Sequence, residues 1–129
     1  MIDFNKILFQ MLTGVTALTG YTGYRFFPLI APENTEFPFV ITSRSFAYEY
    51  TKSGVINGNN LNFNLDVVSL TYDESINLSK LIENAFLNFN IYNHENADLY
   101  NIRLIQISEN FNENAYIQTM QFSCNVYKK

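Results

Sequence analysis

Residues 61–70 constrain the fold of this chain more than any other segment. Apolar and polar side chains alternate there, with Leu61, Phe63, Leu65 and Val67 on one face and Asn62, Asn64 and Asp66 on the other. A period of two is typical of a β-strand with one buried face. Residues 37–50 are rich in aromatic and β-branched residues, and a polar segment, 51–60, separates the two runs. We therefore predict an antiparallel hairpin, with a bulge or bend near residues 43–45.

Two further segments carry apolar residues at the i, i+3, i+4 spacing of an amphipathic helix. Residues 3–13 form the first, and Asp3 is placed to cap its start. Residues 73–90 form the second, with Asp73 and Glu74 at its positive end. Residues 14–23 are rich in Gly and Thr without a clear period, so we expect a loop there.

The remaining apolar runs predict a short strand over residues 24–27 and two strands over 99–109 and 115–127. Residues 91–98 are polar and are expected to form a loop. The 129 residues, 47% of them hydrophobic, suit one domain spanning 1–129. The predicted class is α+β, a mostly antiparallel sheet of four to five strands with two helices packed on one face.

The charge of the chain argues against nucleic-acid binding. It carries eight Lys and Arg residues against twelve Asp and Glu residues, for a net charge of −4. A protein that grips DNA or RNA normally shows a basic face, and an anionic membrane surface would attract one too. The sequence also lacks an apolar run of about 18 residues, so we expect no membrane span.

The residues that could support catalysis are few. His94 is the single histidine and is expected in an exposed loop, while Asp73 and Glu74 are explained as capping residues at a helix start. Cys124 is the single cysteine and is expected to be a buried thiol on a strand. We therefore predict no catalytic centre, no metal site and no cofactor, and keep a small enzyme using Asp73, Glu74 or His94 as an alternative.

Two groups of residues are candidates for contact with a partner. Lys52, Val55, Ile56 and Asn57 lie in the loop of the predicted hairpin. Apolar side chains at a hairpin tip often meet a partner, although the loop could also bury them locally. Tyr21 and Tyr24 belong to an aromatic stretch for which ordinary core packing is the alternative.

One stretch of sequence resembles the phage tail-completion, or tail-terminator, proteins related to the lambda tail terminator. It comprises Tyr24-Arg25-Phe26-Phe27-Pro28, then Ala31-Pro32, a polar turn, and Phe37-Pro38-Phe39-Val40-Ile41. The order of the predicted elements extends the resemblance over nearly the whole chain. The resemblance implies a structural virion protein of the head–tail neck, made in the bacterial host cytoplasm. It implies a homo-oligomeric ring, a hexamer or dodecamer, that contacts connector, portal or tail-tube proteins.

A ring through which DNA passes should not bind it tightly, which suits an acidic chain. We accordingly predict that Glu49, Asp66 or Glu109 lies near the lumen. Two other interpretations stay open: a portal-to-tail adaptor ring of a short-tailed phage, and a soluble non-viral module that binds a protein through residues 51–60.

Overall fold

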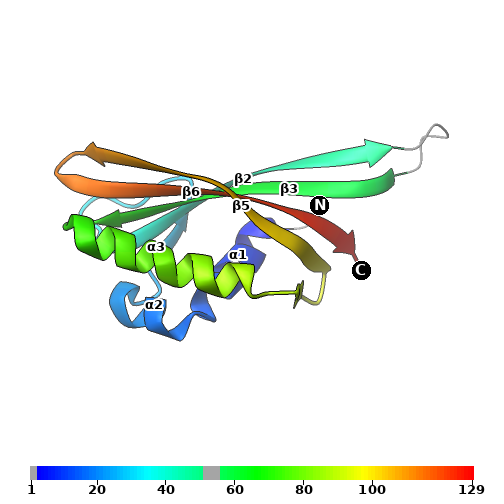
Figure 1. Ribbon diagram of the computed structural model, residues 1–129, viewed down its shortest axis with the longest axis horizontal. Helices are drawn as coiled ribbons and strands as arrows, with labels where there is room; N and C mark the ends of the chain where they lie inside the picture. Colours follow the sequence, from blue (N-terminus) through cyan, green and yellow to red (C-terminus); the bar gives the residue numbers. More distant parts are fainter. Residues whose placement is uncertain (1–2, 51–55) are drawn as a thin grey trace.

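The computed structural model describes residues 3–50 and 56–129, which form one curled sheet of six strands and three helices (Figure 1). In chain order these are α1 (Phe4–Thr13), α2 (Thr16–Thr22), β1 (Phe26–Pro28), β2 (Phe39–Tyr50), β3 (Ile56–Ser69), α3 (Tyr72–Leu87), β4 (Ile91–Asn93), β5 (Ala97–Asn112) and β6 (Ala115–Lys128). The helices lie on one side of the sheet (Figure 1).

The strands follow the order β1-β2-β3-β6-β5-β4 across the sheet. The β1–β2 pair is parallel and the other four pairs are antiparallel. The predicted α+β class is confirmed, but the predicted four to five strands and two helices were too few. The missed strand β4 pairs only three residues with β5, and three residues are too few to show an alternation of apolar and polar side chains.

Helix α1 begins and ends where its apolar stripe predicts. The Asp3 carboxylate caps it, because Oδ1 accepts a hydrogen bond of 3.3 Å from the amide of Lys6. The predicted loop over residues 14–23 was wrong, because α2 forms within it. Leu18 and Thr22 are buried there, and the Thr22 hydroxyl donates to the Leu18 carbonyl at 3.0 Å. Burial of one face stabilises this helix despite its weak helix formers.

The β2–β3 hairpin is confirmed, with unbroken register from Phe39 opposite Val68 to Glu49 opposite Gly58. The bulge predicted at residues 43–45 is absent, because both faces of β2 are covered near its start. Val40 packs on the helix side, while Phe39 and Ile41 join a smaller cluster on the other side. The apolar residues of both faces are thus accommodated in one regular strand.

The β2–β3 register shifts only between Glu49 and Tyr50, and strand β5 carries two further irregularities. Its register against β6 shifts between Tyr100 and Arg103 and again between Leu104 and Gln106. Asn101, in the first shift, has φ of 56°. Each shift adds one residue to β5, and such bulges bend the strand and increase its twist. Figure 1 shows β5 changing direction along its length.

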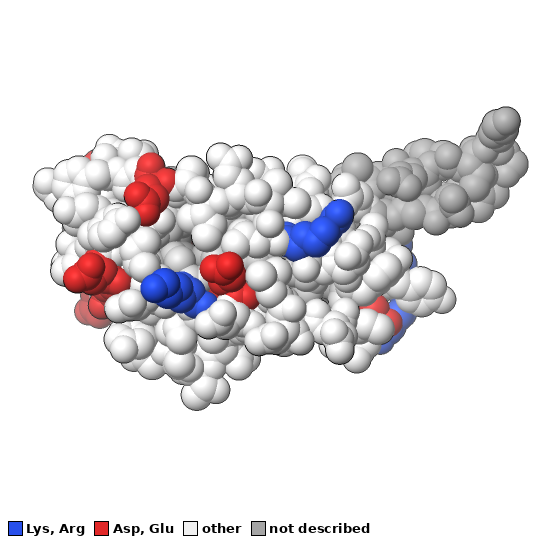
Figure 2. Space-filling view, in the orientation of Figure 1, with Lys and Arg blue, Asp and Glu red and all other residues white. Residues whose placement is uncertain are grey.

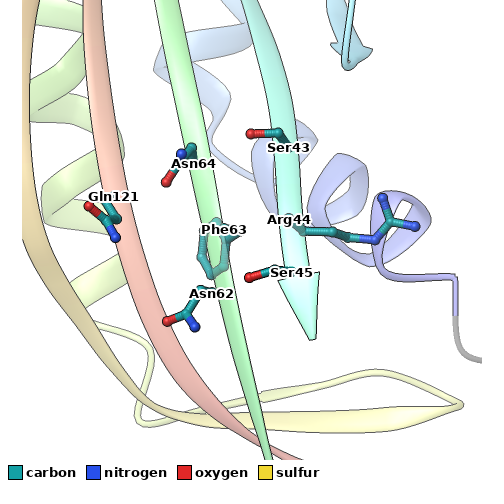
Figure 3. A pocket seen from close by; sticks show the side chains of 7 residues that line it. All are labelled: Ser43, Arg44, Ser45, Asn62, Phe63, Asn64 and Gln121. Atoms are coloured by element: carbon teal, nitrogen blue, oxygen red, sulfur yellow. The ribbon is translucent and has the colours of Figure 1, made fainter. Parts of the chain in front are cut away.

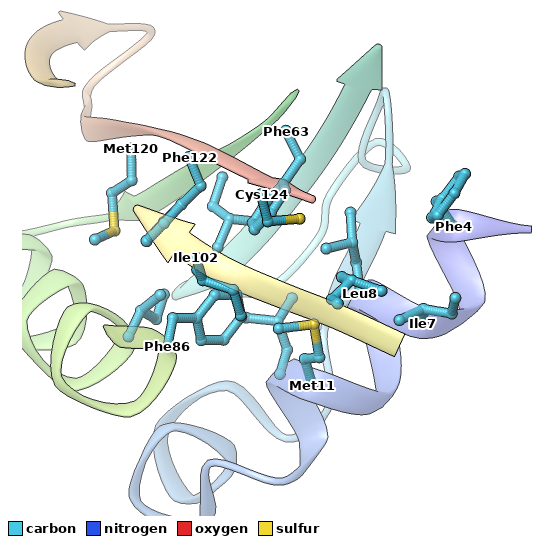
Figure 4. Packing of buried hydrophobic residues seen from close by; sticks show 14 of the residues in the cluster. Phe4, Ile7, Leu8, Met11, Phe63, Phe86, Ile102, Met120, Phe122 and Cys124 are labelled. Carbon is cyan, nitrogen blue, oxygen red and sulfur yellow. The ribbon is translucent and has the colours of Figure 1, made fainter. Parts of the chain in front are cut away.

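The main core fills the space between the sheet and the helices. Three phenylalanine rings form its centre: Phe63 and Phe122 stack at 5.1 Å between centroids, and Phe86 of α3 lies 5.4 Å from Phe122 (Figure 4). Cys124 is fully buried in the same cluster, as predicted. Burial raises the pKa of the Cys124 thiol to about 12.

Helix α3 starts at Tyr72, capped by Thr71, whose Oγ1 accepts a hydrogen bond of 3.2 Å from the amide of Glu74. Asp73 and Glu74 occupy the first turn and not the capping position, so their predicted role holds only for the helix dipole. Glu74 also accepts a hydrogen bond from the Ser69 hydroxyl. The helix ends at Leu87, three residues earlier than expected.

His94 is buried, so its prediction as an exposed loop residue was wrong. It follows β4, and its Nδ1 accepts a hydrogen bond of 3.1 Å from the amide of Asn96. Its own amide donates to the Ala97 carbonyl at 3.0 Å. His94 therefore stabilises the turn between β4 and β5.

Candidate assembly surfaces

The sheet face opposite the helices carries a band of short polar side chains. Ser43 and Ser45 of β2, Asn62 and Asn64 of β3 and Gln121 of β6 line a shallow hollow of about 240 Å³ there (Figure 3). Arg44 points the other way, toward α1, where its Nη1 donates to Asn5 Oδ1 at 2.8 Å. We call this side of the sheet the open face.

The open face is polar but almost uncharged along its two central strands. Where the structure describes the side chains of β3 and β6, Asp66 is the one charged residue of this face. Its carboxylate accepts a hydrogen bond of 2.7 Å from the Thr119 hydroxyl. Further along, the Ser123 hydroxyl donates to Asn60 Oδ1 at 3.3 Å. These two strands offer hydrogen bonds but no cations for phosphate. On the neighbouring strand, Arg103 of β5 pairs with Ser123 and lies on the same face.

An apolar groove of about 630 Å³ marks one end of the open face. Phe39, Ile41, Val68 and Ile117 form its base, and residues 30–35 and 112–113 border it. Nearby, Leu29 and Ile30 are 72% and 77% exposed. Exposed apolar residues beside an apolar groove favour contact with another protein.

An aromatic pocket of about 250 Å³ lies on the helix side, between β5 and the start of α3. The ring of Tyr116 lies 4.8 Å from that of Phe111 and 5.8 Å from that of Tyr72. The Tyr72 hydroxyl donates a hydrogen bond of 2.7 Å to Oε1 of Glu109. This bond to Glu109 raises the pKa of Tyr72. We call Tyr72, Glu109, Phe111 and Tyr116 the Glu109 pocket.

The Glu109 pocket is rich in groups that attract a cation. Within residues 3–50 and 56–129, no salt bridge joins a Lys or Arg to Glu109, whereas Arg25 is paired with Glu36 and Lys129 with Asp98. Aromatic faces attract guanidinium and ammonium groups, and a carboxylate beside them adds direct charge attraction. No sequence pattern indicates this pocket, because Tyr72 and Glu109 are 37 residues apart.

Both outer strands of the sheet leave part of their edge unpaired. Strand β1 pairs with β2 only as far as Thr42, so residues 43–50 of β2 have no outer neighbour among the described residues. Strand β4 pairs with β5 only as far as Tyr100, which leaves residues 101–112 without one. Unpaired backbone amides and carbonyls on such edges are ready to pair with another strand.

The predicted partner residues of the hairpin fall mostly outside what the structure describes. Lys52 and Val55 lie outside the described residues. Ile56 and Asn57 belong to the start of β3, where Ile56 pairs with Tyr50. Their predicted role in contacts stays a prediction.

Tyr21 and Tyr24 are not core residues in this fold. Their side chains are 57% and 60% exposed, Tyr21 on α2 and Tyr24 after its end with φ of 65°. Arg25 beside them has a structural role that the sequence did not reveal. Its guanidinium donates to the carbonyls of Tyr21, Phe37 and Pro38 at 3.2–3.3 Å.

The three acidic residues predicted near a lumen are not gathered in one place. Glu49 lies near the end of β2, and Asp66 lies on the open face. Glu109 is paired with Gln118 of β6. The Gln118 side chain is buried beneath α3 and donates a hydrogen bond of 3.2 Å to the Ser75 hydroxyl. Glu109 therefore lies on the helix side of the sheet. Asp66 and Glu109 therefore project from opposite faces of the sheet.

Charged residues are sparse on the molecular surface shown in Figure 2, where acidic and basic groups are interspersed. Within residues 3–50 and 56–129, no group of three His, Cys, Asp or Glu side chains is arranged to hold a metal ion. None of the described helices is both long and apolar enough to cross a membrane.

No protein-family model and no curated protein sequence matches the chain. A solved structure does match: a chain in the structure titled "Virion of native gene transfer agent (GTA) particle" superposes with a TM-score of 0.74. The match covers 94% of this chain and 91% of that chain, at 13% sequence identity. At this identity the match shows that the two chains share a fold.

Proposed function

We propose that this chain is a structural protein of a phage-like virion and that it forms a ring in the neck or tail. The observation that carries the proposal is the fold shared with a chain of a gene transfer agent virion over nearly the full length of both chains. The resemblance of residues 24–41 to tail-terminator proteins supports the same role. In this role the chain binds proteins and performs no catalysis.

The surfaces of the subunit are consistent with assembly into a ring. The unpaired parts of β2 and β5 face the two opposite edges of the sheet, so one copy offers each neighbour a different contact. A contact between two different surfaces is heterologous, and heterologous contacts generate rings when their rotation closes.

The open face is the part of the subunit best suited to line a channel for DNA. Its central strands present Ser, Thr, Asn and Gln side chains with Asp66 among them. Phosphate binding depends on Lys and Arg, and the two central strands supply neither, so this wall attracts DNA weakly, with Arg103 of β5 as the cation beside it. In this proposal Asp66 is the lumen residue, whereas Glu109 faces away from the channel.

Light scattering after size exclusion and negative-stain micrographs of the purified protein test the proposal. We expect closed rings of one size, and the protein itself at the head–tail junction of particles purified from the producing cells. A monomer at every concentration, together with absence of the protein from purified particles, would contradict the proposed function. Rings located elsewhere in the particle would correct the position and keep the structural role.

A further inference from the structure

We propose that neighbouring copies join by continuing one sheet, with residues 106–110 of β5 in one copy pairing antiparallel with residues 43–47 of β2 in the next. This inference rests on the proposed function, because it specifies the contact by which ring subunits associate. It assigns the occupant of each free edge as a second copy of this chain.

The two free edges run in directions that suit each other. The antiparallel pairs β2–β3, β3–β6 and β6–β5 leave β5 running opposite to β2 within one copy. A second copy placed beside the first without inversion therefore meets β5 with an antiparallel β2. The helices of both copies then remain on the same side of the joined sheet.

The backbone groups of the two edges also match. On β2, the amide of Val40 donates to the Arg25 carbonyl and the carbonyl of Thr42 accepts from the amide of Leu29. The backbone amides and carbonyls of even-numbered residues therefore point to the outer edge of the sheet. Backbone groups alternate sides along a strand, so Arg44 continues this series.

On β5, the Ala97 carbonyl accepts from His94 on the outer side. The two bulges then shift the alternation of backbone directions along β5. According to the pairs with β6, the backbone amides and carbonyls of residues 107 and 109 point to the outer edge. Pairing Glu109 with Arg44 therefore brings outward groups of both strands together.

The same register supplies a cation to the Glu109 pocket. Glu109 lies on the helix side, and Arg44 also projects toward the helices. Residues that face each other in an antiparallel pair have their Cβ atoms about 5 Å apart. The neighbour's Arg44 guanidinium thus lies within reach of the Glu109 carboxylate and the rings of Phe111 and Tyr116. Among the registers that the alternation of outward backbone groups allows, this one brings the two opposite charges together.

The register has a geometric consequence for the ring. Within one copy, Glu109 lies level with Val40, through Gln118 and Val67. Pairing with Arg44 in place of Val40 shifts each copy by four residues, or roughly 13 Å, along the strand direction. Each copy also adds four strands, or about 19 Å, to the width of the joined sheet. Such a displacement closes on itself only if the strands tilt, here by about 35°, which is typical of closed β-barrels.

A disulfide between neighbouring copies tests the register. Ser45 and Ser108 are opposite each other in the proposed pair, at a position where Cα atoms are about 4.5 Å apart and a disulfide fits. Within one copy β3 and β6 separate β2 from β5, so the two positions are roughly 14 Å apart or more. Cys124 is buried and is not expected to form a disulfide in this experiment. We expect oxidised assemblies of S45C/S108C to give a ladder of covalent multimers beyond the dimer.

The matched control is S45C/K80C, because Lys80 is exposed on α3, away from the β5 edge. We expect no ladder from it. Rings of S45C/S108C seen by electron microscopy without a ladder would overturn the edge pairing while the ring stands. Failure to assemble both alone and in particles would overturn the proposed function and this inference with it.

Exchange of the two charges tests the side-chain contact. E109R and R44E should each weaken assembly about tenfold, and the double variant E109R/R44E should recover most of the loss. Thermal unfolding of the isolated subunits checks that each variant folds. Equal defects in the single and double variants would overturn the contact between Arg44 and Glu109.

Discussion

The Tyr72 hydroxyl donates a hydrogen bond of 2.7 Å to Oε1 of Glu109, which joins the first residue of α3 to strand β5. The carboxylate accepts the phenolic proton and would repel a tyrosinate, so the pKa of Tyr72 is raised above 10.0. We expect Glu109→Gln to lower the pKa of Tyr72 toward 10.0, measured by NMR titration of ¹³C-labelled tyrosine. Asp73 contributes least to the shift, so Asp73→Asn should change the pKa less. Equal changes in the two variants would contradict the hydrogen bond as the main cause.

The cap of α3 should contribute measurably to stability. Thr71→Ala removes the side-chain oxygen that accepts the Glu74 amide, and we expect the free energy of unfolding to fall by about 1 kcal/mol. Thr71→Ser keeps the hydroxyl and should fall by less than half of that. Urea unfolding of the three proteins measures the difference, and an alanine variant as stable as the serine variant would refute the capping role.

The phenylalanine cluster should be the most sensitive part of the core. Phe86 is fully buried and packs against both Phe63 and Phe122. Phe86→Ala leaves a cavity between α3 and the sheet, and we expect a loss of about 3–5 kcal/mol. Phe86→Leu fills most of the space and should cost roughly 1–2 kcal/mol. Equilibrium unfolding gives both values, and similar costs would show that the site collapses around the smaller side chain.

The buried thiol should make the protein sensitive to high pH. The pKa of Cys124 is about 12 in the folded chain, against an ordinary value of 9.0 for a cysteine thiol. Between these values the unfolded chain releases the thiol proton and the folded chain keeps it. The stability contributed by the neutral thiol is therefore complete below pH 9 and declines as pH rises toward 12, by about 1.4 kcal/mol per pH unit.

The variant Cys124→Ala isolates this effect, because both proteins share the tyrosine and lysine titrations. We expect the difference in unfolding free energy between wild type and variant to shrink above pH 9. A difference that stays constant to pH 11 would show that Cys124 ionises in the folded chain. Thiol reagents should also label Cys124 only after unfolding.

Arg25 should stabilise the segment before β2 through its geometry as well as its charge. It donates to three backbone carbonyls, of Tyr21, Phe37 and Pro38. A lysine cannot reproduce this fork, so we expect Arg25→Lys to cost about 1–2 kcal/mol by thermal or urea unfolding. Glu36→Gln is the control for the 3.8 Å ion pair, and it should change little because Glu36 is 85% exposed. A larger effect of Glu36→Gln than of Arg25→Lys would reverse this assignment.

Sequence patterns predicted the elements whose burial is one-sided. The stripe of α1 with its Asp3 cap, the alternation of β3 and the stripe of α3 each follow from a single buried face. The sequence patterns failed where contacts with the rest of the fold determine the secondary structure. Helix α2 depends on burial of Leu18 and Thr22, and β4 depends on its pairing with β5. The bulge was misplaced because β2 is covered on both faces near its start.

The candidate surfaces were harder to predict than the fold. Tyr21 and Tyr24 are exposed, and no local pattern distinguishes them from core aromatic residues, so their role in contacts stays a prediction. The Glu109 pocket joins residues from α3, β5 and β6, so it depends on strand order and register. Neither can be read from the sequence before the pairing of β3 with β6 is known.

The two long hairpins project toward opposite ends of the sheet, β2–β3 at one end and β5–β6 at the other (Figure 1). The chain therefore has a head and a foot that differ in sequence and shape. Copies standing side by side in the same orientation would collect all heads on one rim and all feet on the other. Such a ring is directional, because its two rims differ and each binds a different neighbouring protein. The orientation of the ring among its neighbours is therefore determined by the subunit itself.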